Sequence, residues 1–250
     1  MNKLLFRFTL LSAVLIGFFS AGLYFMAASA LAAEESDQLL ENIGELLQKA
    51  TAAVELARET GDLELSKAAL KQTNAAAGLL LRVADKAQKA GNAELALVAL
   101  NMANRTSSVI SDVLLISGES TDALLASAAL DVAEQTSLLI SNIATMAQET
   151  DNPPLAQTAL GAANIADAMV TQVAEVASLI AQTSTDRASV EVAEQVVAKA
   201  ETVQNITTQA TSTALAAGAV PIEGEGFEEP AAPPAPQEPP LQDTDAASAV

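Results

Sequence analysis

A 30-residue period in the apolar residues is the feature of this sequence that most constrains its fold. One column of this period holds Leu70, Leu100, Leu130, Leu160 and Val190, and further columns begin at Leu65, Leu80 and Val83. Self-similarity at such a period is typical of repeat proteins, in which each unit buries its apolar face only against its neighbours. The sequence therefore predicts a series of like units packed side by side.

The residues that break helices recur on the same period and divide the chain into units. Gly61 precedes Asp62, Gly91 precedes Asn92, and Asn152 precedes a proline. Glycine just past a helix and Asp or Asn just before the next one are stop and start signals. Between these points the chain is rich in Ala, Leu, Val, Glu and Gln, which favour helix. No comparable breaker recurs within a unit, so we predict one helix per repeat, at about 36–60, 63–90, 93–117, 121–149, 153–183 and 186–217.

Within each predicted helix, apolar residues follow a three-four spacing that places them on one stripe. The stripe must be covered by neighbouring helices, and connections of two to four residues make consecutive helices antiparallel. We therefore predict an all-α fold, an antiparallel up-down array or bundle of six long helices on a 30-residue repeat. A closed bundle and an open array satisfy the same stripes. The first helix fits the period least well, which is typical of a terminal, capping element.

The two ends of the chain differ from the repeats in composition. Residues 1–32 hold two basic residues, a long apolar run and a small-residue cleavage pattern, which predict a secretory signal peptide; an uncleaved anchor is the alternative. Residues 33–219 form the predicted Ala-rich helical repeat domain. Residues 220–250 are rich in proline and acidic residues and hold no Lys or Arg, which predicts a disordered tail. We expect an exported protein, either periplasmic or extracellular.

The composition excludes several kinds of site. The chain holds no Cys and no His, so it cannot form a thiolate nucleophile, a Ser-His-Asp triad or a structural zinc site. The 12 basic residues against 31 acidic ones give a formal net charge of -19, which argues against binding nucleic acid or anionic membranes. We therefore predict a protein that is not an enzyme and that carries no cofactor, with calcium or a similar divalent cation as the one weak alternative.

Two groups of carboxylates are candidates for binding such a cation through oxygen ligands. Asp37, Glu41 and Glu45 lie at helical spacing in the first predicted helix. Glu134 and Glu194 belong to a mid-helix polar column that the 30-residue period aligns with Asn74, Asn104 and Asn164. Most polar residues are exposed and a buried carboxylate needs a partner, so we expect this column to face outward or to lie at the boundary of the core. The alternative for both groups is a solvated acidic face.

The tail holds the candidate interaction residues. Phe227 is the one aromatic residue after the signal segment, and it lies among acidic residues and prolines. Pro233, Pro234 and Pro236 could dock in an aromatic groove as a polyproline segment. The alternative is that the tail is a flexible acidic spacer.

The sequence thus predicts an exported, non-enzymatic helical repeat protein that acts as a structural or protein-interaction module. Its expected partner is another protein or a second copy of the chain. One alternative is an acidic protein that binds divalent cations or mineral surfaces. Another is an amphipathic-helix protein that binds lipid or hydrophobic surfaces, with membrane contact only through the signal segment or neutral hydrophobic surfaces.

Overall fold

The computed structural model describes residues 35–120 and 122–221, and these residues form helices joined by short turns. Residues 35–60 are helical and constitute the first helix. The helices that follow are α2 (Leu63–Ala90), α3 (Ala93–Ser120), α4 (Ala123–Glu149), α5 (Pro153–Thr183) and α6 (Arg187–Ala216). The all-α prediction is confirmed, with helix bounds close to those expected. The predicted signal segment and the tail residues Phe227, Pro233, Pro234 and Pro236 lie outside the described residues.

The predicted stop and start signals account for the turns between helices. The side chains of Asp62, Asp122 and Asp186 each accept a hydrogen bond from the backbone N–H two residues later, at the starts of α2, α4 and α6. Such N-caps satisfy backbone donors that have no partner within the helix. Gly91 ends α2 with φ 61°, a left-handed conformation that favours glycine. Interactions within a few residues of each turn therefore determine where these helices begin and end.

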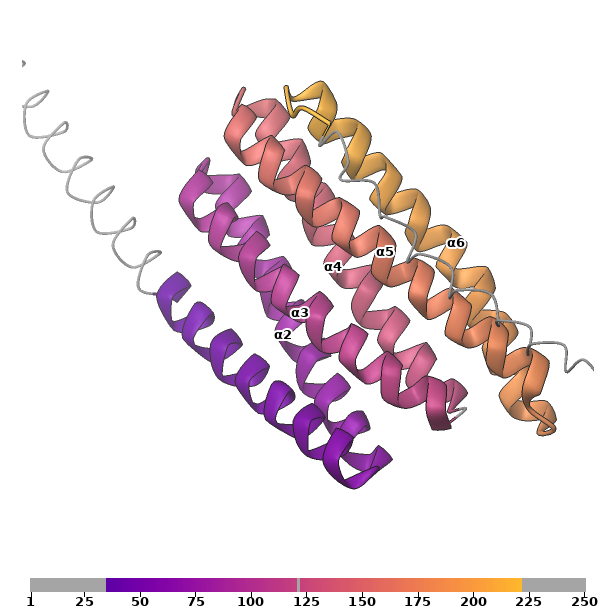
Figure 1. Ribbon diagram of the computed structural model, residues 1–250. Coiled ribbons are helices and arrows are strands. Elements are labelled where there is room, and N and C mark those ends of the chain that lie inside the picture. The colour runs from indigo at the N-terminus through magenta and orange to yellow at the C-terminus, as the bar shows by residue number, and fades with distance from the viewer. Residues whose placement is uncertain (1–34, 121, 222–250) are drawn as a thin grey trace, which may run out of the picture. The chain divides into compact units, whose positions relative to one another are not determined.

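The helices pack in two layers, which decides between the open array and the closed bundle. Helix α4 lies between α2 and α6 in one layer, and α3 packs beside α5 in the other. The first helix joins the second layer, since the guanidinium of Arg58 lies 2.6 Å from the carboxylate of Asp112 on α3. Among the labelled helices, α2 has no packing contact with α5 or α6. The repeats therefore form an open array in which helices two apart in the sequence are parallel neighbours (Figure 1).

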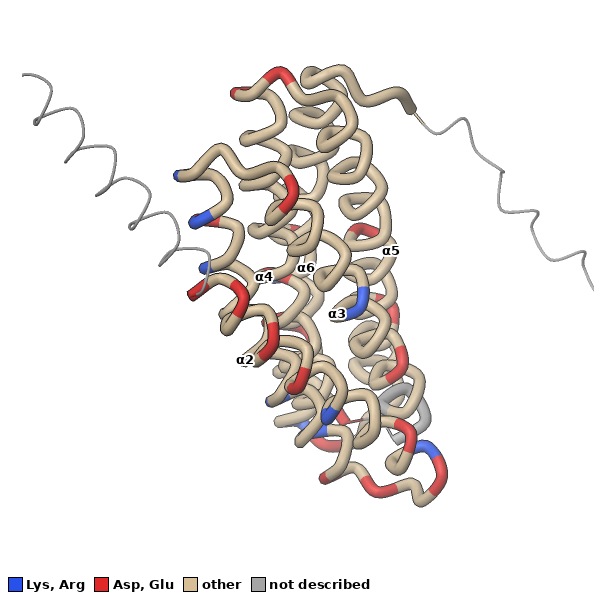
Figure 2. Tube along the Cα trace, turned by 90° about the vertical axis from the view of Figure 1, so that its left-hand side faces the viewer, with Lys and Arg blue, Asp and Glu red and all other residues tan. Residues whose placement is uncertain are grey.

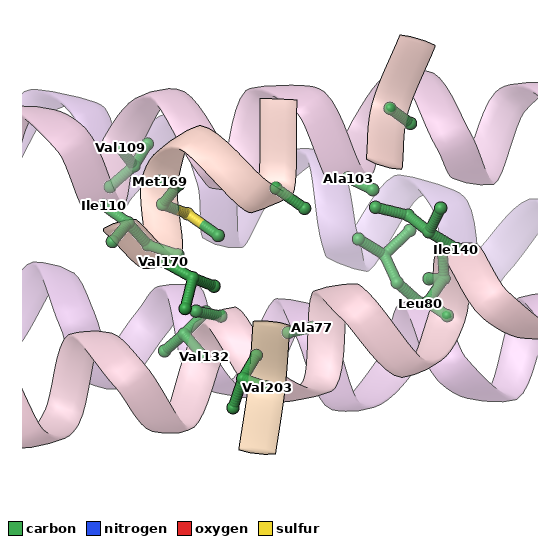
Figure 3. Packing of buried hydrophobic residues seen from close by; sticks show 14 of the residues in the cluster. Ala77, Leu80, Ala103, Val109, Ile110, Val132, Ile140, Met169, Val170 and Val203 are labelled. Atoms are coloured by element: carbon green, nitrogen blue, oxygen red, sulfur yellow. The ribbon is translucent and has the colours of Figure 1, made fainter. Parts of the chain in front are cut away.

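The core runs between the two layers and is built from the periodic apolar columns. Every member of one column, Val83, Val113, Ile143, Val173 and Val203, is at most 1% exposed. Figure 3 shows side chains from α2 to α6 packed in this core, with Leu80 and Ile140 among the largest. Alanine makes up about half of the buried apolar residues, which lets helices approach closely but buries little area per residue. The core is continuous and thin.

Helix α4 holds the most central position. It contacts each of α2, α3, α5 and α6. Among the described helices, α4 is also the one that is long and apolar enough to cross a membrane, and 61% of its most apolar window is buried inside the array. A core helix of a water-soluble fold meets the same criterion, so its apolar character is accounted for by its position.

The helices at the two ends of the array present polar faces to solvent. On α6, Glu191, Glu194 and Glu201 are exposed, and on the first helix so are Glu41 and Glu45. Polar outer faces on terminal repeats keep an array soluble and stop further units from packing. The capping role expected of the first helix stays a prediction, because the same helix also exposes Leu56.

Candidate interaction surfaces

The structure places the candidate cation ligands apart from one another. Asp37, Glu41 and Glu45 are exposed on the first helix, and the Glu45 carboxylate lies 3.2 Å from the ammonium group of Lys49. Glu134 lies on α4, and Glu194 is exposed on α6. Nowhere in the described ranges do three or more Asp and Glu side chains gather so that they could hold a metal ion. Cation binding by these residues stays a prediction.

Glu134 is engaged by a lysine from the neighbouring helix of its layer. The Lys199 ammonium on α6 lies 2.6 Å from Asp131 and 2.7 Å from Glu134, both on α4. Partial burial alone would lower the pKa of Lys199, but hydrogen bonds to the two carboxylates and their charges outweigh it and raise that pKa. Glu134 therefore ties α4 to α6.

Other members of the polar column also lie at the surface or at its boundary, as expected. Asn74, Asn164 and Glu194 are exposed, while Asn104 is half-buried. The carbonyl oxygen of Asn74 accepts a hydrogen bond of 2.8 Å from Gln135 on α4. Asn74 thus joins α2 to α4 within one layer. The column as a whole is divided between the two layers.

The exposed apolar side chains show a pattern that the sequence analysis did not anticipate. Within the described helices, the four most exposed large apolar residues are Leu124 at 64%, Leu115 at 57%, Leu179 at 48% and Leu56 at 46%. Leu56, Leu115 and Leu179 lie in the last two turns of the first helix, α3 and α5, and Leu124 is the second residue of α4. Because consecutive helices are antiparallel, these positions share one end of the array. We call it the leucine end.

Comparing residues 30 apart in the sequence shows that three of these leucines are unusual at their repeat positions. Leu115 falls in the same column as Glu55, Asp85, Thr145 and Glu175. Leu124 occupies the repeat position that Glu64 and Glu94 hold in earlier repeats. Leu179 occupies the repeat position of Glu59, Lys89 and Glu149. A leucine in a column that holds no other large apolar side chain marks a departure from the needs of folding. Leu56 gave no such signal, because the first helix is out of register with the others.

Two surface hollows lie on either side of Leu124 at the leucine end. One, of about 320 Å³, lies between α2 and α4 and is lined by residues including Leu70, Lys71 and Ala128. The other, of about 390 Å³, lies at the starts of α2, α4 and α6 and is lined by residues including Leu63 and Val192. The first hollow has a mainly apolar lining, a shape that a partner side chain can fill. The second is also lined by Asp122, Asp186 and Ser189 and is as polar as it is apolar.

Charge on the molecule is mostly negative around these apolar residues. Figure 2 shows few Lys and Arg residues among many Asp and Glu residues along the chain. From residue 106 to residue 186 the sequence holds no Lys or Arg, and Leu115, Leu124 and Leu179 all fall in that stretch. The sequence around Leu115 and Leu179 therefore combines apolar side chains with negative charge, whereas Lys67 and Lys71 line the hollow beside Leu124.

Comparison with known proteins gives structural neighbours only. No protein-family model matches the chain, and no curated protein matches it. Among solved structures, the chain is similar to the DHF58 filament, with 26% identity over 74% of this chain and 78% of that chain and a TM-score of 0.47. It is also similar to the DHF79 filament, with 26% identity over 72% and 83% and a TM-score of 0.44.

A third neighbour is the de novo designed helical repeat protein DHR64, with 20% identity over 71% of this chain and 99% of that chain and a TM-score of 0.29. These neighbours are designed or filament-forming helical proteins by name. Nothing about the surfaces of the present chain follows from this likeness.

Proposed function

We propose that this chain is an exported helical repeat scaffold that binds a protein partner at its leucine end. The observation that carries the proposal is the exposure of Leu56, Leu115, Leu124 and Leu179, each about half exposed or more, near one end of an array whose core does not need them. Single exposed leucines are ordinary, whereas four of them near one end of an array favour a contact surface there.

The fold supports a scaffold role because it offers a long surface of packed helices with shallow hollows at Leu124. Repeat arrays bind partners over such surfaces. The absence of Cys and His from the sequence leaves few side chains for catalysis. Binding is therefore the activity that these residues support best.

Site-specific photo-crosslinking in the compartment where the chain resides tests the proposal. A photoreactive phenylalanine analogue at Leu115 or Leu124 is expected to give a discrete adduct with a partner. The matched control is the same analogue at Val98, which is 38% exposed near the other end of α3. Equal adducts from Leu115 and Val98, or none from either leucine, would contradict a docking site at the leucine end.

Export is tested separately, by the mass of the purified chain and its cell fraction. We expect a mature chain beginning at Ala33, recovered from the periplasm or the medium, because the small-residue pattern precedes that position. An intact amino terminus in the membrane fraction would support the uncleaved anchor instead. A cytoplasmic chain would contradict export.

A further inference from the structure

Helix α2 differs from the other described helices in its charge. Its basic residues outnumber its acidic ones, whereas acidic residues prevail in the first helix and in α3 to α6. The basic residues of α2 are Lys67, Lys71, Arg82, Lys86 and Lys89, and its acidic residues are Glu64 and Asp85. In a chain with a formal net charge of -19, α2 is the helix that favours an acidic partner.

Two of these basic side chains, Lys71 and Arg82, are exposed and form no ion pair within the described ranges. The other three are paired with carboxylates, Lys67 with Glu64 and Asp122, Lys86 with Glu35, and Lys89 with Asp85. Carboxylates close to the two unpaired residues already have cationic partners. Glu35, on which the charge of Arg82 acts, is paired with Lys86, and Asp131, which lines the same hollow as Lys71, is paired with Lys199.

Lys71 and Arg82 share one face of α2. Eleven residues make close to three helical turns, so the two positions lie about 16.5 Å apart along the same side of the helix. Ala75 and Gly78 lie between them on that side. Small residues therefore separate the two charges, and an extended chain can lie close to the helix there.

Lys71 also lines the hollow of about 320 Å³ between α2 and α4, which we call the α2–α4 hollow. Its apolar lining consists of Leu70, Leu124, Leu125 and Ala128. This volume is near the lower end of the range of ligand pockets, about 300–1,000 Å³, and suits one large side chain. The other polar residues of the lining already have partners, Lys67 in Asp122, Asn74 in Gln135 and Asp131 in Lys199. Lys71 is thus the lining residue whose charge is left for a ligand.

The sequence of the tail contains a segment of matching chemistry. Phe227, the one aromatic residue after the predicted signal segment, is flanked by Glu223, Glu225, Glu228 and Glu229. No Lys or Arg occurs after Lys199. An aromatic ring supplies a large apolar contact area at one point, and the flanking carboxylates pair with cations beside it.

We propose that residues 223–229 of a second copy of the chain bind α2 on the face that carries Lys71 and Arg82, with Phe227 in the α2–α4 hollow. This inference rests on the proposed function and names the partner. Alternate side chains of an extended segment share a side and rise about 3.3 Å per residue. Phe227 in the hollow therefore places Glu225 or Glu229 beside Lys71. Glu223, about 13 Å further along α2, comes within reach of the Arg82 side chain.

The length of the chain favours a second copy over the same copy. The described chain ends beside Val220, whose backbone N–H donates to Gln157 on α5 over 2.8 Å, at the end of the array opposite the leucine end. Along the helix axes the hollow lies about 25 Å from the level of Gln157, and it lies at least one helix spacing of about 8–10 Å to the side. The seven residues from Val220 to Phe227 span at most about 25 Å when fully extended. They are too short for this path, which also has to pass around packed helices.

The contact uses different surfaces on the two copies. Such a contact gives either a reciprocal dimer or an open chain of copies, depending on whether the rotation between copies closes. In both cases the association depends on concentration and weakens with salt, because part of it is electrostatic.

The variant Phe227→Ser tests the tail side without changing any residue of the array. Its matched control is Leu241→Ser, which removes a large apolar side chain elsewhere in the tail. Sedimentation velocity over a concentration series measures self-association of the chain as recovered from expressing cells. We expect Phe227→Ser to weaken association by about tenfold or more and Leu241→Ser to leave it unchanged, because a buried aromatic anchor carries most of the affinity of a small interface. Equal behaviour of the two variants would overturn the proposal.

A charge exchange tests the array side. Lys71→Glu is expected to weaken association severalfold, whereas Arg105→Glu, at an exposed arginine of α3, is the control and is expected to leave it unchanged. Adding Glu225→Lys and Glu229→Lys to the Lys71→Glu chain is expected to restore association, because opposite charges then face each other again. A circular dichroism melt checks that each variant folds. Equal effects of the Lys71 and Arg105 variants, or no restoration, would contradict the assigned pairing.

A labelled peptide of residues 221–231 tests the segment by itself. Added to the Phe227→Ser chain, it is expected to bind at least about tenfold more tightly than the same peptide with serine at position 227. A photoreactive phenylalanine analogue at position 227, in a mixture of isotope-labelled and unlabelled chains, identifies the copy that is bound. We expect crosslinks between copies, to residues 124–131. Crosslinks confined to one chain would show that the tail binds its own array and would overturn the proposal.

Failure here is distinguishable from failure of the proposed function. If the analogue at Leu124 captures a different protein while Phe227→Ser leaves self-association unchanged, the docking surface stands and the second copy is the wrong partner. If neither Leu115 nor Leu124 gives an adduct, the proposed function fails as well. An adduct from Leu124 that contains two copies of the chain and is lost in Phe227→Ser would support both.

Discussion

Helices α4 and α6 come from the same 30-residue repeat, yet they are held in the array in different ways. Helix α4 packs against four labelled helices and buries Leu125, Leu130, Leu139, Ile140 and Ile143. Helix α6 has neighbours on one side only and buries alanines, one threonine and two valines. The repeat fixes which face of a helix is buried, and the position in the array decides how much that burial contributes to stability.

This difference has a consequence for stability and for binding. Apolar area buried per helix falls from the centre to the end, so the terminal helix depends more on small side chains and on polar bonds to its neighbours. At α6 these include the hydrogen bond between the Thr207 hydroxyl and the Asp167 carboxylate. The central helix can afford exposed leucines such as Leu124 on its solvent face, because its own core holds it in place.

The largest expected effect is at the centre. Replacing Ile140, which is 1% exposed, by alanine should cost about 2–5 kcal/mol of unfolding free energy, because a cavity opens in the core beside Leu80. Urea denaturation followed by circular dichroism measures this loss. A cost as small as that of a surface substitution would mean that α4 is not the centre of the array.

A smaller effect is expected at the end. Replacing Val203, which is fully buried on α6, by alanine removes two methyl groups and should cost about 1–2 kcal/mol. Hydrogen exchange should show the loss of protection confined to α6, since a terminal repeat opens without the others. Loss of protection spread evenly over α2 to α6 would show that the end and the centre unfold as one unit, and the comparison would fail.

The smallest effect concerns the ion pairs that join α4 to α6. Changing Lys199 to methionine should cost less than about 1 kcal/mol, because its side chain is 40% exposed and its ion pairs are screened by water. The pKa of Lys199 is raised in the folded chain. Its contribution is therefore fully present below the unfolded-state pKa of about 10.4 and is lost as pH rises through the folded-state pKa.

The test is the difference in unfolding free energy between the two proteins as a function of pH. We expect a constant difference between neutral pH and about pH 9, shrinking at higher pH. A difference that grows above pH 10 has the wrong sign and would contradict the assigned pairing of Lys199 with Asp131 and Glu134.

Much of the fold could be predicted from the sequence because its signals are local. Asp62, Gly91 and Asn152 mark helix ends by chemistry that acts within a few residues, and the apolar columns name the buried faces. The two-layer arrangement could not be predicted in this way. A stripe on a helix shows that the face is covered but not which helix covers it.

The exposed leucines from which we propose a contact surface were harder to predict, for a related physical reason. Leu115 and Leu179 lie in different columns of the period, so nothing in the sequence aligns them. They lie near the same end of the array because α3 and α5 are two apart in the sequence and run in the same direction. Folding requirements repeat every 30 residues, whereas a surface for a partner needs to occur only once.

The most direct test of the open array uses the absence of cysteine from the chain. Pairs of cysteines introduced at residues 74 and 135, where Asn74 and Gln135 are hydrogen-bonded across α2 and α4, should be joined rapidly by a short bifunctional thiol reagent. A pair at residues 74 and 195 should not react, because α2 and α6 are not in contact and Gln195 holds on α6 the repeat position of Gln135. Efficient crosslinking of 74 to 195 would show a closed bundle and contradict the two-layer account.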